Sequence, residues 1–97
     1  GKRNNTNRLR FFHCDGFNDR NLRRNKFDLI VANLLLNSIL RLCRDFYSSL
    51  SNGGIIIVSG ILENQQKNVI SLYRKFKFKL IRRNYFEGWV SIIFKKV

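Results

Sequence analysis

The 97-residue sequence has no methionine, no proline and only one alanine. Its two cysteines, Cys14 and Cys43, are too few for a disulfide scaffold and lack the spacing of a CxxC pair or a zinc site. We expect both to be free, buried thiols in a protein of the reducing cytoplasm. Because no methionine opens the chain, we also expect an internal piece of a longer protein.

Several functional motifs are missing as well. No segment approaches the ~20 apolar residues of a membrane span, and residues 1–10 lack the apolar stretch of a signal peptide. The sequence contains no HExxH motif, P-loop, GxGxxG turn or cluster of metal ligands. We therefore predict no membrane contact and no metal site, and the residues alone identify no catalytic group.

Acidic residues are scarce. Six Asp and Glu stand against 19 Lys and Arg, which gives a net charge of +13. Such charge attracts RNA, but the basic residues are dispersed and most aromatic residues fall at positions expected in a core rather than on an exposed stacking surface. Abundant Asn and Ile indicate an AT-rich coding bias, which also raises the number of lysines. The charge therefore predicts no more than a weak contact with RNA or the ribosome.

The apolar pattern alternates between strand and helix periods. Strands are expected over 9–14, 27–32, 55–58, 78–86 and 89–94, and helices over 36–50 and 69–77. We expect Asn37 or Ser38 to cap the first helix and Gly53-Gly54 to end it. This alternation predicts an α/β fold with a mostly parallel sheet. The two-residue turn Glu87-Gly88 makes the last two strands antiparallel.

Polar residues that follow strands are the candidate ligand contacts, because α/β sheets bind ligands at the carboxyl ends of their strands. Asn33 follows the strand 27–32 and offers a hydrogen-bond donor and an acceptor, although an asparagine there also serves as a helix cap or turn former. Asp15 follows the first strand and is either a ligand contact or part of a turn. Asp28 lies near the start of its strand and is interpreted as structural.

Three segments carry a resemblance to a known family. Residues 27–35 (FDLIVANLL) resemble the FDLIVANIL segment of the ribosomal protein L11 methyltransferase (PrmA) family. Residues 53–62 (GGIIIVSGIL) resemble its GG-x-x-hydrophobic-LSGIL segment, with Gln65 or Gln66 at the position of the Gln that follows. Residues 87–90 (EGWV) resemble its closing E-W-V strand.

The resemblance implies a fold and a function. The family methylates amino groups of a large-subunit ribosomal protein with S-adenosylmethionine, on a Rossmann-like class I methyltransferase fold with an antiparallel C-terminal strand. A cytoplasmic protein N-methyltransferase with a ribosomal protein substrate is therefore expected. In the family the Asn after the fourth strand contacts the cofactor region, so the resemblance assigns cofactor binding to Asn33 and, secondarily, to Asp15.

The family's Gly-rich first motif, D-x-G-C-G-S-G, and the acidic residue that holds the cofactor ribose are absent. Residues 1–97 are therefore expected to be the C-terminal half of a methyltransferase domain, a fragment with little or no activity alone. The family's strand order, 3-2-1-4-5-7-6, implies that the strand at 9–14 lacks its neighbours and that the strand at 27–32 has an open edge. The alternative, based on charge, is a non-catalytic basic module that binds RNA or the ribosome.

Overall fold

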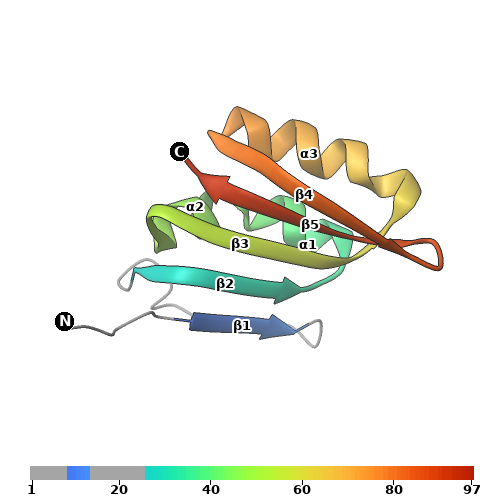
Figure 1. Cartoon of the computed structure of the whole chain (residues 1–97), viewed down its shortest axis with the longest axis horizontal. Helices are drawn as coiled ribbons and strands as arrows, with labels where there is room; N and C mark the ends of the chain where they lie inside the picture. The colour runs from blue at the N-terminus through green and yellow to red at the C-terminus, as the bar shows by residue number, and fades with distance from the viewer. Residues whose placement is uncertain (1–8, 14–25) are drawn as a thin grey trace.

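The computed structural model describes residues 9–13 and 26–97. Along the chain its elements are β1 (Leu9–His13), β2 (Phe27–Asn33), α1 (Leu36–Arg41), α2 (Cys43–Ser49), β3 (Leu50–Leu62), the 3-10 turn η2 (Glu63–Gln65), α3 (Gln66–Lys75), β4 (Phe78–Phe86) and β5 (Trp89–Lys96) (Figure 1). All five expected strands and both expected helical segments are present. None of the helices in these residues is long and apolar enough to cross a membrane.

The described strands form one sheet in the order β1-β2-β3-β5-β4. β1, β2 and β3 run parallel to one another, whereas β5 lies antiparallel between β3 and β4. Helices α1 and α2 connect β2 with β3, and η2 and α3 connect β3 with β4. The prediction of an α/β fold with a mostly parallel sheet and an antiparallel C-terminal strand is confirmed.

One face of the sheet, which we call the covered face, packs against the helices (Figure 1). The strand residues on this face are buried, and they lie opposite one another on neighbouring strands. They are Ile30, Ala32, Ile56, Val58, Ile92 and Phe94. Tyr73 of α3 stacks on Phe94 with 4.8 Å between ring centroids. The Tyr73 hydroxyl donates to the carbonyl of Ile39 in α1 at 2.8 Å, so the buried polar group is satisfied.

The opposite face, which we call the open face, is also apolar. It carries half-buried side chains at Leu29, Val31, Ile55, Ile57 and Ile93. Val31 pairs with Ile57, and Ile57 pairs with Ile93, so the side chains form a row across three strands. The apolar run at 27–32 is typical of a strand covered on both faces, but in the described residues helices bury only one.

The expectation that the strand at 27–32 has an open edge is wrong. The first strand, which lacks the neighbours that the family's strand order gives it, lies at that edge instead. β1 pairs in parallel with β2 along its whole length, from Leu9 opposite Leu29 to His13 opposite Asn33. This pairing satisfies backbone N–H and C=O groups on an edge of β2 that would otherwise be open. The exposed edge at this end of the described sheet therefore belongs to β1.

The single helix expected over 36–50 is two helices. Leu42, with φ −92° and ψ 3°, separates α1 from α2. Neither Asn37 nor Ser38 is the cap, because α1 begins after Leu35 and that N-cap has no side-chain hydrogen bond. Burial of the apolar side chains on the covered face, rather than a capping side chain, stabilises this helix start.

Gly53-Gly54 does not end the helical segment, which stops at Ser49. The two glycines lie inside β3, between residues that pair with Phe27 and Leu29 of β2 at a register shift. Gly53 has φ 79°, a conformation that costs glycine little and other residues more. The glycine pair therefore forms the irregular segment of β3 at which its register with β2 shifts.

Candidate functional site

The carboxyl ends of β2 and β3 lie side by side and bring Asn33 next to Ser59. These two residues are register partners, and the N–H of Leu34 donates to the carbonyl of Ser59 at 3.3 Å. Because ligands of open α/β sheets bind beyond the carboxyl ends of parallel strands, this edge is the candidate site.

Gly60 allows the two strand ends to approach each other. Its φ is 87°, and a Cβ built on it would lie 2.9 Å from Oδ1 of Asn33 and 2.9 Å from the carbonyl oxygen of Leu34. Any other residue would therefore meet both backbone strain and a steric clash. The close approach of the two strand ends therefore requires glycine at position 60.

Asn33 is exposed at this edge. It does not cap α1, since the N-cap of that helix is Leu35, so the helix-cap interpretation is wrong. Its amide can offer one donor group and one acceptor group to a ligand beyond the strand ends.

The two acidic candidates, Asp15 and Asp28, differ in outcome. Asp15 lies outside the described residues; the strand before it, β1, ends at His13, which is paired with Asn33 at the same edge. Asp28 accepts a hydrogen bond of 2.7 Å from the hydroxyl of Ser51 and so ties β2 to the start of β3. That contact agrees with the structural role expected for Asp28.

Exposed apolar side chains form a lip near this edge. Leu62 at the end of β3 pairs with Trp89, which pairs with Phe86 across the β4–β5 hairpin, and their exposed fractions are 39%, 50% and 72%. The N–H of Glu63 donates to the carbonyl of Gly88 at 3.0 Å and holds the hairpin against the end of β3. Sequence reasoning placed Trp89 in an apolar strand and missed the lip, because only the register aligns these side chains.

The two glutamines after β3 hold this region together. Oε1 of Gln65 accepts from the N–H of Leu62 at 2.9 Å. Oε1 of Gln66 accepts from the hydroxyl of Tyr85 at 3.1 Å, which links α3 to β4. Both contacts are structural, and they stabilise η2, which connects the end of β3 with α3.

Among residues 9–13 and 26–97, the groups with shifted pKa values lie away from this edge. Burial raises the pKa of the Cys43 thiol to about 12. Burial, and then the charge of Cys43, raises the pKa of Tyr73 well above its ordinary value. Burial, and then the charge of Lys26, lowers the pKa of Lys96, whose ammonium donates to the carbonyls of Tyr47 and Leu50 at the end of α2. These three groups act in the core and its boundary.

Within residues 9–13 and 26–97 there is no group of three His, Cys, Asp or Glu side chains that could hold a metal ion. What the edge offers is an exposed amide, a glycine beside it and an apolar lip.

Comparison with known proteins matches residues 2–97 to the model of the ribosomal protein L11 methyltransferase (PrmA) family. A ribosomal protein L11 methyltransferase of Mesorhizobium japonicum is 47% identical over 73 residues, which are 75% of this chain and 25% of the relative. The chain thus spans about a quarter of the length of that curated relative.

Solved structures agree with the fold. The ribosomal protein L11 methylase of Lactobacillus delbrueckii subsp. bulgaricus superimposes with a TM-score of 0.70 and 31% identity, over 75% of this chain and 38% of that one. The N-methyltransferase NodS of Bradyrhizobium japonicum, solved in complex with S-adenosyl-L-homocysteine, has a TM-score of 0.61 at 16% identity, over 82% of this chain and 49% of that one. The described sheet is therefore part of a class I methyltransferase fold.

Proposed function

Since the chain belongs to the ribosomal protein L11 methyltransferase (PrmA) family, we propose that it forms the C-terminal part of a methyltransferase domain. That domain methylates amino groups of a ribosomal protein. The observation that carries the proposal is the close approach of Asn33 and Gly60 at the carboxyl edge of the sheet. Both residues lie in segments that resemble the family.

We propose that S-adenosylmethionine binds at this edge. A Cβ at Gly60 would crowd the Asn33 amide, so the glycine leaves that amide free to donate to and accept from the polar groups of a cofactor. Asp15 remains the second proposed cofactor residue. When bound, S-adenosylmethionine supplies a methyl group on a sulfonium sulfur, which a neutral amine takes by direct displacement.

The chain's own contribution to the reaction is positioning. Asn33 orients the cofactor or the acceptor amine through its amide, and the lip of Leu62, Phe86 and Trp89 keeps water from the reacting amine. We assign no general base, because the acceptor amine reacts in its neutral form. Holding the two reactants in line is the main source of acceleration.

We propose that this chain is only one part of the methyltransferase domain. Three features support it: the chain spans 25% of a curated relative, the Gly-rich cofactor motif is absent from the sequence, and the open face is apolar. Calorimetric titration of the isolated chain with S-adenosylmethionine is expected to give no micromolar binding. Micromolar binding would contradict the idea that the rest of the domain is required.

A chimera tests the activity. Residues 9–97 replace the matching segment of the Mesorhizobium relative, and transfer of labelled methyl groups to ribosomal protein L11 is measured. We expect methylation, and we expect Asn33→Ala to lower kcat/KM at least ten-fold, because one positioning hydrogen bond to a reactant is lost. Asn37→Ala, at an exposed α1 position without a capping bond, is the control with unchanged activity. A folded chimera without methylation, or equal effects of the two substitutions, would contradict the proposed function.

The proposed partner is the ribosomal protein substrate in the cytoplasm. The net charge of +13 favours, in addition, contact with RNA.

A further inference from the structure

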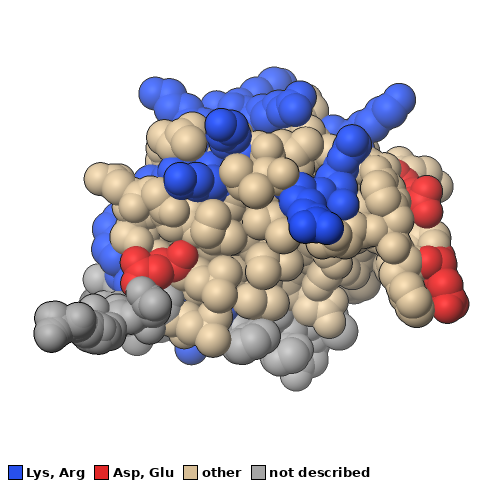
Figure 2. All heavy atoms as spheres, viewed as in Figure 1, with Lys and Arg blue, Asp and Glu red and all other residues tan. Residues whose placement is uncertain are grey.

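Basic side chains concentrate on α3 and β4. Between Gln66 and Phe86 the chain has seven basic residues and no acidic residue. All seven are exposed, and we call them the α3–β4 surface: Lys67, Arg74, Lys75, Lys77, Lys79, Arg82 and Arg83. Figure 2 shows Lys and Arg gathered over this part of the molecule. The seven cations thus come from one stretch of the chain, and the fold leaves all of them exposed.

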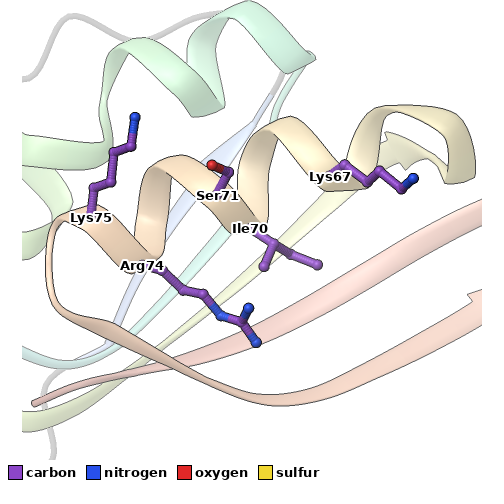
Figure 3. A pocket seen from close by; sticks show the side chains of 5 residues that line it. All are labelled: Lys67, Ile70, Ser71, Arg74 and Lys75. Carbon is purple, nitrogen blue, oxygen red and sulfur yellow. The ribbon is translucent and has the colours of Figure 1, made fainter.

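The helix part of this surface is a shallow hollow. Lys67, Ile70, Ser71, Arg74 and Lys75 line it on the outer side of α3. Arg74 and Ile70 extend toward β4, whereas Lys75 and Ser71 lie on the side of α1 and α2 (Figure 3). The cations thus flank the helix on both sides, where a polyanion could lie along it.

The strand part adds aromatic rings. Side chains alternate across β4, and each face carries one arginine and one exposed ring: Arg82 and Phe86 on one face, Arg83 and Tyr85 on the other. Tyr85 is 50% exposed and Phe86 is 72% exposed. Exposed rings beside cations are the combination with which proteins bind single-stranded nucleic acid, because bases stack on the rings while the cations hold phosphates.

Contacts within the protein order part of this surface. Oε1 of Gln66 accepts from the Tyr85 hydroxyl at 3.1 Å and from Nη1 of Arg83 at 3.4 Å. Arg83 also borders a hollow with Lys67 and Ile70, so the strand and helix parts are continuous. Because these groups are held before a ligand arrives, less conformational entropy is lost on binding.

Protection of a sheet edge explains only part of the charge. β4 is an outer strand, and basic residues on outer strands discourage pairing with other chains. That requirement does not extend to the helix, yet Lys67, Arg74 and Lys75 lie on α3. It also does not account for the exposed rings of Tyr85 and Phe86, because exposed apolar rings on an outer strand favour association with other chains.

We propose that the α3–β4 surface binds single-stranded RNA, with phosphates on its lysines and arginines and bases stacked on Phe86 and Tyr85. A membrane fits less well, because the rings lie on opposite faces of a strand and cannot enter one bilayer plane together. An acidic peptide would use the charge but not the stacking. The inference deepens the proposed RNA contact, and Phe86 is the one residue that it shares with the lip proposed for methyl transfer.

The experiment measures binding of the whole 97-residue chain to a labelled single-stranded RNA of about 12 nucleotides by fluorescence anisotropy. Affinity is expected to fall with added salt. The double variant Arg74→Gln/Arg82→Gln should reduce the slope of log affinity against log salt by about 1.4, since each lost phosphate contact removes about 0.7. Arg41→Gln/Arg44→Gln removes the same charge from α1 and α2 and should change the slope much less.

A second variant separates RNA from other polyanions. Phe86→Leu keeps an apolar side chain but removes the ring, and it should weaken RNA binding about five-fold or more. Binding to heparin, which has no bases, should remain unchanged. Circular dichroism checks that each variant keeps the fold. The methylation assay on the chimera uses Arg74→Gln/Arg82→Gln, which changes no residue of the site proposed for methyl transfer, and so reports separately on the proposed function.

Three outcomes would overturn the inference. The first is equal loss of RNA binding in both arginine double variants, which would make the charge non-specific. The second is an unchanged RNA affinity in Phe86→Leu, which would leave only polyanion attraction. The third is tighter binding to anionic phospholipid vesicles than to RNA at the same salt concentration.

Discussion

The two faces of the sheet are built from the same kinds of residue but have different surroundings. Ile56 and Ile57 are neighbours in β3; the first is fully buried under the helices and the second is half-buried on the open face. Hydrophobic stabilisation follows the area removed from water rather than the residue type. The covered face therefore provides most of the stability of the described residues, and the open face keeps apolar area that this chain alone buries only in part.

The largest expected effect compares these two isoleucines. Ile56→Ala should lower the free energy of unfolding by about 2–5 kcal/mol, because it leaves a cavity among the helices. Ile57→Ala should cost about 1 kcal/mol, since less of its side chain is buried. Urea unfolding followed by circular dichroism measures both. Equal losses would mean that the open face is covered in solution and would break the comparison.

The next effect concerns the edge where the candidate site lies. Gly60→Ala should cost about 2–3 kcal/mol, because it adds a clash with Asn33 to the strain of a positive φ. Gly88→Ala has nearly the same φ, 85°, but nothing lies within 4 Å of its added Cβ, so it should cost about 1 kcal/mol. Thermal unfolding of the two variants gives the difference. If both cost the same, the close approach of the two strand ends does not require glycine at position 60.

The smallest expected effect is a pH dependence of the free energy of unfolding, which arises from Cys43 among the helices on the covered face. The pKa of Cys43 is about 12 in the folded chain against 9.0 ordinarily, so the stabilising contribution of the buried thiol is complete below pH 9 and is lost as the pH rises toward 12. The free energy of unfolding should fall by about 1 kcal/mol between pH 8 and 10, within the limit of about 1.4 kcal/mol per pH unit for one proton.

Two variants distinguish the titration of this thiol from that of other groups that lose protons at alkaline pH. Cys43→Ala should flatten the fall in stability between pH 8 and 10, although it lowers stability at every pH. Ile57→Ala, on the open face, should leave the slope as it is. The lowered pKa of Lys96 acts in the opposite direction. The folded lysine loses its proton at a lower pH than the unfolded one, whose pKa is 10.5, so stability rises with pH up to about that value. A slope that persists in Cys43→Ala would assign the titration to another group.

Local chemistry explains which features could be predicted. Apolar runs and helical periodicity placed the strands and helices, because burial of one face imposes the period. Asn33 could be named because it follows an apolar strand. The caps at Asn37 or Ser38 and the single long helix could not be excluded, since packing around Leu42 and not a local signal separates α1 from α2. The lip at Trp89 depends on strand register, which no short segment contains.

By itself, the sequence determined the α/β class, the element order and the family, because apolar periods and short motifs are properties of contiguous residues. The tertiary structure alone decided that β1 pairs with β2, that Gly60 lies against Asn33, and that one face of the sheet stays open. Those features join residues that are distant in the chain, and their positions follow from hydrogen bonding and packing across the sheet.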